Sequence, residues 1–189
     1  GIAAQIANNF IAKKVNLICA ITTPMAQISY SAAKDTDIPV VYTAVTNPVV
    51  AELAKEDGSP VGNITGTCDK LPIKKQLEMI RKIMPDAKKI GILYCTSEVN
   101  SEMSVKEYKE AAKDYGFEII EQAVTSSADV PLATDSILTK VDCLNNITDN
   151  TVVNSLDIVL DKAKKAGKPV YGSEIEQVKK GCVASMGLD

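Results

Sequence analysis

Hydroxyl, amide and carboxylate side chains collect directly after five short apolar runs of this sequence. They form the groups Thr22-Thr23-Pro24, Thr46-Asn47-Pro48, Thr96 to Ser101, Thr148 to Thr151 and Ser173-Glu174. Each group alone has the composition of a helix start, because Ser, Thr, Asn and Asp cap free backbone N–H groups. Together they contain no His, Arg or Lys, and this inventory favours recognition of a solute over catalysis.

The chemistry available in these groups suits a zwitterionic solute. Hydroxyls and free N–H groups at helix starts can hold a carboxylate, which helix N-termini favour. Glu98 and Asp149 can hold an ammonium group through charge-assisted hydrogen bonds. An amino acid carries both charges, so we expect a small zwitterion as ligand. On this interpretation Asp149→Ala abolishes binding with little loss of stability.

Several classes of function are disfavoured by what the sequence lacks. It contains no histidine, which is the most common general base and metal ligand, and it shows no obvious nucleophile–base pair. Its five cysteines form no CxxC pair, and neither GxGxxG nor GxxxxGK(S/T) occurs. We therefore expect no enzyme, no catalytic residues, no metal site and no cofactor.

The bulk composition describes an ordinary globular chain without a surface for nucleic acid. Of 189 residues, 46% are hydrophobic and 24% charged, with a net charge of −3, close to average usage in soluble proteins. Lysines and acids are interspersed and only 4% of residues are aromatic, so neither a basic face nor a base-stacking platform is expected. No apolar run reaches the ~18 residues that a membrane-spanning helix needs.

Hydrophobic periodicity predicts the elements that would position the polar groups. Short Val- and Ile-rich runs alternate with longer amphipathic stretches, a pattern typical of βαβ units and a mainly parallel sheet. The expected strands are residues 15–21, 39–45, 64–67, 89–95, 117–124, 141–147, 169–172 and 182–185. The expected helices are residues 1–14, 24–33, 49–55, 71–84, 101–115, 129–140, 152–166 and 174–180. Ligands of open α/β sheets bind at the carboxyl ends of strands, where the five polar groups fall.

The alternation of strands and helices restarts near residue 69. We interpret residues 1–68 as a partial N-terminal α/β lobe and residues 69–189 as a C-terminal α/β lobe. The rival interpretation is one doubly wound domain, because both blocks have lengths that a single large sheet could accommodate.

Six segments carry a resemblance to a known family. They are ITTPMAQ, PVVYTAVTNPV, GNITGTCD, LPIKKQLEMIRKIMPDAKKIGILY, SEVNSE and TDNTVV. Over essentially the whole chain they resemble the ABC-transporter solute-binding family that includes tryptophan- and other aromatic-amino-acid-binding lipoproteins. The resemblance implies a type I periplasmic-binding-protein fold, in which two α/β lobes joined by a hinge clamp a ligand. It also implies an ABC permease as partner and an extracytoplasmic location, either periplasmic or lipid-anchored at the outer face of the cytoplasmic membrane.

The matching motifs assign ligand contact to ten residues. They are Thr23, Thr46, Asn47, Ser97, Glu98, Asn100, Ser101, Asp149, Asn150 and Glu174. Two departures from the family pattern leave the identity of the amino acid open. Asn47 stands where the family often has Asp, and Asn145-Asn146-Ile147 replaces the apolar stretch and Pro that usually precede TDN.

The resemblance also implies that relatives carry a further strand–helix–strand before this sequence and a helix after it. The first lobe is then expected to be incomplete and to lack its first strand. Such a lobe would expose apolar surface or a sheet edge, through which two copies of the chain could form a dimer.

Two other functions fit the same pattern of elements. The ligand-sensing module of a LacI-type transcription factor has similar lobes, and the native upstream sequence distinguishes it by a DNA-binding head in place of an export leader. An α/β enzyme, such as a sugar or nucleotide transferase, would need a catalytic group beyond Glu98 and Asp149.

Overall fold

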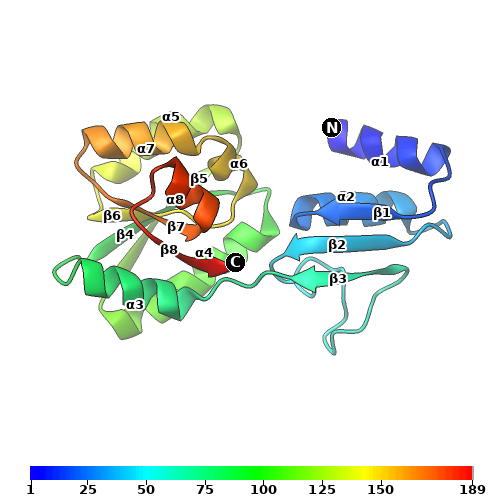
Figure 1. The fold of residues 1–189 in the computed structure, drawn as a ribbon, viewed down its shortest axis with the longest axis horizontal. Helices are drawn as coiled ribbons and strands as arrows, with labels where there is room; N and C mark the ends of the chain where they lie inside the picture. Colours follow the sequence, from blue (N-terminus) through cyan, green and yellow to red (C-terminus); the bar gives the residue numbers. More distant parts are fainter. Residues whose placement is uncertain (189) are drawn as a thin grey trace. The chain divides into compact units, whose positions relative to one another are not determined.

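The computed structural model describes residues 1–188 and divides into two compact units, the first ending at Lys70 and the second starting at Leu71. In both units every pair of neighbouring strands is parallel (Figure 1). The predicted fold class, with mainly parallel sheets flanked by helices, is confirmed. No helix of the described residues is long and apolar enough to cross a membrane.

The first unit has a three-stranded sheet with two helices. Its elements are α1 (Ile2–Ala12), β1 (Ile18–Ile21), α2 (Thr23–Ala33), β2 (Val40–Val45) and β3 (Ile64–Cys68), and its strand order is β1-β2-β3. Helix α2 packs against β1 and β2, and α1 packs against α2. The run VVYTAV forms the central strand because β-branched and aromatic side chains fit a pleated, half-buried surface.

Strand β1 is an open edge of this sheet. Its side chains alternate between buried and exposed, and Ile21 is 60% exposed. An apolar hollow of about 350 Å³ lies among α1, β1 and α2, with Ile6, Phe10 and Met25 in its lining. The first unit therefore exposes the apolar edge that the sequence predicts.

The second unit has a five-stranded sheet of order β5-β4-β6-β7-β8. Its strands are β4 (Lys89–Cys95), β5 (Glu118–Val124), β6 (Cys143–Asn145), β7 (Val170–Glu174) and β8 (Ser185–Leu188). Its α-helices are α3 (Ile73–Ile83), α4 (Val99–Ala111), α5 (Val130–Leu138), α6 (Asn150–Asn154), α7 (Leu156–Lys165) and α8 (Ile175–Lys180). Two short 3₁₀ helices, η1 (Ala112–Tyr115) and η2 (Ser127–Asp129), precede β5 and α5.

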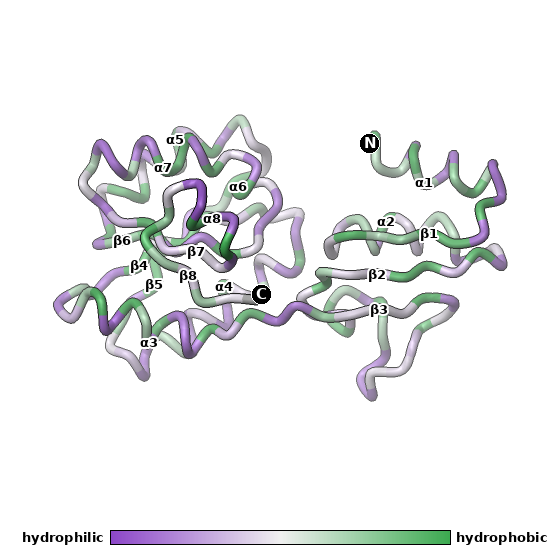
Figure 2. The backbone as a smooth tube through the Cα atoms, viewed as in Figure 1, coloured by the Kyte–Doolittle hydropathy of each residue, from purple (hydrophilic) through white to green (hydrophobic). Residues whose placement is uncertain are grey.

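Helices cover both faces of the five-stranded sheet. Helices α3 and α4 pack on one face through residues such as Leu77 and Tyr108, and α5 and α7 pack on the other through residues such as Ile137 and Val159. Both faces of β4 are therefore buried, which explains why IGILYC is a continuous apolar run. The tube through this unit accordingly shows a hydrophobic β4 (Figure 2).

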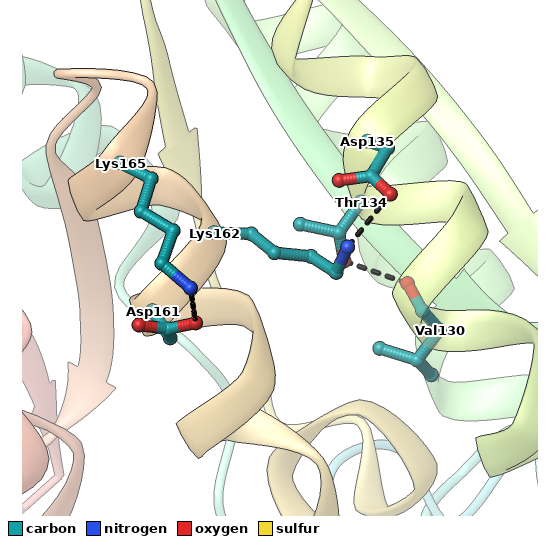
Figure 3. Close-up of polar contacts among 6 residues, drawn as sticks. All are labelled: Val130, Thr134, Asp135, Asp161, Lys162 and Lys165. Atoms are coloured by element: carbon teal, nitrogen blue, oxygen red, sulfur yellow. Dashed lines mark hydrogen bonds and ion pairs between the residues drawn. The ribbon is translucent and has the colours of Figure 1, made fainter.

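One ion pair joins α5 to α7 on the surface, and a second lies within α7 (Figure 3). Lys162 Nζ lies 2.6 Å from Asp135 Oδ2 of the other helix, and Lys165 Nζ lies 2.6 Å from Asp161 Oδ2 within α7. Exposed pairs of this kind contribute ~0–1 kcal/mol each. The apolar contacts beneath them therefore hold the two helices together.

Residues 49–55, which are predicted to be helical, instead form turns at residues 49–52, a bend at Leu53 and an isolated bridge from Ala54 to Pro60. Asn47 begins this segment as a helix cap does, since its Oδ1 accepts hydrogen bonds from the N–H groups of Val49 and Val50 at 3.0 and 3.1 Å. Glu52, with a φ angle of 59°, then leaves the helical conformation, and the N–H groups of Leu53 and Ala54 both donate to Pro48 O, at 2.8 and 3.0 Å. The segment is therefore a single turn closed by a left-handed residue.

Three elements of the second unit differ from their expected bounds. The expected helix 152–166 is two helices, α6 and α7, which are separated at Ser155. The expected strand 141–147 is shortened at both ends to β6, whose last residue is Asn145. The last strand begins at Ser185 instead of Cys182, whose N–H still closes α8 on Gln177 O at 3.0 Å.

Arg81, the single arginine of the sequence, fastens α3 to the turn before β5. Its guanidinium donates hydrogen bonds to the carbonyls of Pro85 and Ala87 at 2.8 Å, and to that of Tyr115 at 2.8 and 3.1 Å. Its central carbon lies 3.8 Å from the centre of the Phe117 ring, within the range of a cation–π contact. One side chain thus joins three backbone segments.

Candidate functional site

The carboxylate of Glu98 joins the starts of two helices in the second unit. Glu98 lies between β4 and α4 and is 4% exposed. One oxygen accepts hydrogen bonds from the backbone N–H and the side-chain amide of Asn150 at 3.0 and 2.6 Å. The other accepts from the backbone N–H and the hydroxyl of Thr151 at 3.0 and 3.1 Å. A carboxylate has about four acceptor positions, so all the acceptor positions of Glu98 are occupied by hydrogen bonds that hold the start of α6.

Asp149 is fully buried and caps α6. One oxygen accepts a hydrogen bond from Val152 N–H at 2.9 Å, and the other accepts one from Cys95 N–H at 2.7 Å. Cys95 is the last residue of β4, so Asp149 ties the end of that strand to α6. Burial raises the pKa of the Asp149 carboxyl, the two backbone hydrogen bonds oppose this, and the nearby Glu98 charge raises it further.

Both carboxylates therefore shape this edge of the sheet through bonds within the chain. An ammonium group, which these carboxylates are predicted to hold, could approach them only by sharing or replacing these hydrogen bonds. The expected stability of Asp149→Ala also changes. That variant leaves the buried N–H groups of Cys95 and Val152 without an acceptor, and unpaired buried groups are costly.

The structure brings most of the predicted residues of the second unit to the carboxyl ends of its strands. Ser97 and Glu98 follow β4, Asn100 and Ser101 lie in the first turn of α4, and Asp149 and Asn150 lie at the start of α6. Ser97 is exposed, whereas Asn100 and Ser101 are buried. Asn100 Oδ1 has no hydrogen-bond partner among residues 1–188. Glu174 lies at the end of β7, where it accepts a hydrogen bond from Gln177 Nε2 at 3.1 Å.

The predicted residues of the first unit also lie at strand ends. Thr23 follows β1, and Thr46 and Asn47 follow β2. Thr23 and Thr46 are buried, and the Thr23 hydroxyl has no hydrogen-bond partner in the part of the chain that the structure describes. Thr22 and Ala44, beside them, have φ angles of 82° and 54°, which side chains with a Cβ rarely adopt. Backbone strain of this kind is concentrated at functional sites.

Three buried amides of the second unit are not among the predicted site residues. Asn145 ends β6, Asn146 follows it and Gln76 lies in α3, and each is at most 5% exposed. The Ser173 hydroxyl donates to Asn146 O at 2.8 Å, and Gln76 Nε2 lies 3.3 Å from Ser173 Oγ. The one available signal was the interruption of an apolar strand by two asparagines. That signal indicates a weak strand as readily as a polar interior.

Six polar atoms of this interior have no hydrogen-bond partner within residues 1–188. They are Nδ2 and Oδ1 of Asn145, Nδ2 of Asn146, Oε1 of Gln76 and the hydroxyls of Tyr108 and Tyr171. A buried polar group left unpaired costs about 1–3 kcal/mol, and a whole domain is stable by only ~5–15 kcal/mol. So many unpaired groups are unusual in the interior of a stable domain.

The fold defines a class of α/β protein with two units, whose strand ends carry polar and mostly uncharged side chains. The family described as ABC transporter substrate binding protein matches residues 1–189, and the chain belongs to this family. A tyrosine-binding protein of Clostridioides difficile (strain R20291) is 43% identical over 185 residues, which are 98% of this chain and 53% of that protein. The resemblance carried by the six sequence segments is confirmed.

Two solved structures are similar over the whole chain. A conserved domain protein from Vibrio cholerae has a TM-score of 0.94 and 37% sequence identity. The match covers 100% of this chain and 63% of the Vibrio chain. An ABC domain from Streptococcus pneumonia in complex with L-Trp has a TM-score of 0.94 and 34% sequence identity. The match covers 99% of this chain and 63% of the Streptococcus chain. The chain thus spans about half the length of the curated relative and under two thirds of these structures.

Proposed function

We propose that this chain forms part of an extracytoplasmic solute-binding protein that serves an ABC importer. Its solute is a small zwitterion, most simply an aromatic or other hydrophobic amino acid. The observation that carries the proposal is the family match along the whole sequence. The tyrosine-binding relative and the homologous structure in complex with L-Trp support the ligand class.

The hydrogen bonds of the site support a division of roles among its residues. Glu98 and Asp149 hold the starts of α4 and α6 in place, because their oxygens are engaged by the chain. Within the second unit, solute contact is assigned to the hydroxyls and amides around these two carboxylates. Within the first unit, it is assigned to the polar residues at the strand ends. These contact residues are Thr23, Thr46, Asn47, Ser97, Asn100, Ser101 and Asn150, with Glu174 at the margin. The solute is held and released unchanged.

The purified chain is expected to melt at a higher temperature in the presence of L-Tyr, L-Trp or L-Phe. A solute at a hundred times its Kd stabilises a protein by ~2.7 kcal/mol, which corresponds to about 5–10 °C for a chain of this length. Differential scanning fluorimetry measures the shift, and mass spectrometry of the recovered solute tests that it is unchanged.

Glucose, ribose and the D-enantiomers of the same amino acids are the matched controls, and they are expected to leave the melting temperature where it is. A screen of all L-amino acids without any shift, in a chain that melts cooperatively, would contradict the proposed function.

The family assignment supports an ABC permease as partner. The protein would then work outside the cytoplasm, either in a periplasm or anchored by lipid to the outer face of the cytoplasmic membrane. In both places it would deliver its solute to the permease.

We further propose that the open edge of β1 pairs two copies of this chain. Ile6 and Ile21 are 50% and 60% exposed beside the apolar hollow of the first unit, and an open strand edge with apolar surface is a typical association site.

Light scattering coupled to size exclusion is expected to show a dimer at micromolar concentration, and Ile21→Lys is expected to give a monomer. The control Ile158→Lys changes a side chain that is 43% exposed in the second unit and should leave the dimer intact. A wild-type chain that is monomeric at every concentration argues against the pairing.

A further inference from the structure

Three polar side chains lie together inside the apolar core that α3 and α4 form on the second unit's sheet. They are Tyr108 of α4, Asn145 at the end of β6 and Tyr171 of β7. Asn145 is 1% exposed, and both tyrosines are 0% exposed. Tyr108 and Tyr171 belong to the same cluster of buried residues as Ile92 and Ile147, so the three polar groups are surrounded by hydrocarbon.

The topology places the three side chains next to one another. Asn145 and Tyr171 are register partners on the neighbouring parallel strands β6 and β7, so their side chains point to the same face of the sheet. Tyr108 approaches from α4, and its hydroxyl interacts with the Asn145 side chain. Even so, neither hydroxyl and neither polar atom of the Asn145 amide makes a hydrogen bond of ordinary geometry within residues 1–188.

The cluster contains neutral groups. Burial raises the pKa of Tyr108, and burial together with the neighbouring Cys143 raises the pKa of Tyr171 to about 12. Both hydroxyls therefore keep their protons at physiological pH, and the amide of Asn145 carries no charge. A neutral, hydrogen-bonding guest suits such a site better than an ion, since an unpaired charge is costly to bury.

A water molecule has the hydrogen-bonding capacity that this cluster lacks. Each hydroxyl can donate one hydrogen bond and accept others, and the amide offers both donors and an acceptor. A buried water typically makes about three hydrogen bonds to polar groups of this kind. We propose that Tyr108, Asn145 and Tyr171 bind an ordered internal water molecule, which anchors the end of β6 beneath the residues that follow it.

A crystal structure of the full chain at a resolution that shows ordered solvent tests the site directly. We expect a water oxygen within about 2.7–3.2 Å of both tyrosine hydroxyls and of the Asn145 amide. A direct hydrogen bond between Tyr108 and Asn145, with no solvent density beside Tyr171, overturns the proposal.

Stability measurements test the same site in solution. Tyr108→Phe and Tyr171→Phe are each expected to lower the folding equilibrium constant about five- to tenfold. Each variant removes one hydrogen-bond partner of the water and leaves the remaining polar groups less well paired. Tyr115→Phe, a half-buried tyrosine packed on the same cluster, is the matched control and should change it less than twofold.

Replacing the whole cluster separates a shared water from three independent groups. The triple variant Tyr108→Phe, Asn145→Leu, Tyr171→Phe is expected to lose less stability than the three single variants together, because it removes every buried group that needs the water. Strictly additive losses overturn the proposal. So does Asn145→Leu alone if it raises the melting temperature, since the amide would then be an unpaired group and not a ligand.

Discussion

Replacing Arg81 by alanine is expected to lower the free energy of unfolding by about 3 kcal/mol. The guanidinium donates to the carbonyls of Pro85, Ala87 and Tyr115 and stacks over Phe117. Hydrogen bonds to a charged donor contribute ~1.5–3 kcal/mol, and a cation–π contact adds ~0.5–1 kcal/mol or more. The sum is reduced because Arg81 is half-buried and water can reach some of the freed carbonyls.

Urea denaturation followed by circular dichroism measures this loss, and two further variants identify its origin. Arg81→Lys keeps the charge but loses the planar fork of donors, so it is expected to recover less than half of the stability. Lys82→Ala removes the next residue, whose ion pair with Glu78 at 2.8 Å is exposed, and should cost at most ~1 kcal/mol. An Arg81→Lys variant as stable as wild type would show that charge alone matters at this position.

Hydrophobic periodicity was sufficient to predict the architecture wherever a segment is buried on both sides. Strand β4 and helix α3 appear at their expected positions because IGILYC and the spacing of Leu77 and Ile80 admit few alternatives. Periodicity failed where the backbone leaves the helical conformation after one turn. Asn47 starts that turn as a helix cap, and Glu52, with a φ angle of 59°, ends it. Residue composition alone does not reveal a positive φ at a glutamate.

The sequence was sufficient to predict that these polar residues lie at strand ends, but not which hydrogen bonds their side chains form. Parallel strands place Glu98 and Asp149 at one edge, as the order of elements requires. Whether their oxygens face a solute or the backbone depends on how α6 packs beside α4, which involves residues about fifty positions apart. The buried polar residues around Asn145 were equally hard to predict, because its neighbours come from α4 and β7. Contacts between distant segments, and not local pattern, decide these roles.

Asp149→Ala is expected to lower the free energy of unfolding by about 3 kcal/mol and to weaken solute binding at least tenfold. Stability falls because the helix cap on Val152 and the acceptor for Cys95 N–H are lost together, and each such loss costs ~1–2 kcal/mol. Binding falls because α6 loses its fixed position beside Glu98. Chemical denaturation and titration calorimetry with an aromatic amino acid measure the two effects. Wild-type stability in this variant would contradict the structural role.

The pH dependence of stability provides a second, independent test of Asp149. Burial raises its pKa in the folded state, so its contribution is fully present below the unfolded-state pKa of ~3.9 and is lost as the pH rises through the folded-state pKa. The stability difference between wild type and Asp149→Asn is therefore expected to shrink from about pH 3 to pH 7.

Asp129 is the matched control, because hydrogen bonds from Thr125 and Ser126 lower its pKa. Its contribution is present above the unfolded-state pKa and is lost as the pH falls, so the difference for Asp129→Asn should grow over the same range. Equal slopes for the two variants would show that burial does not control Asp149.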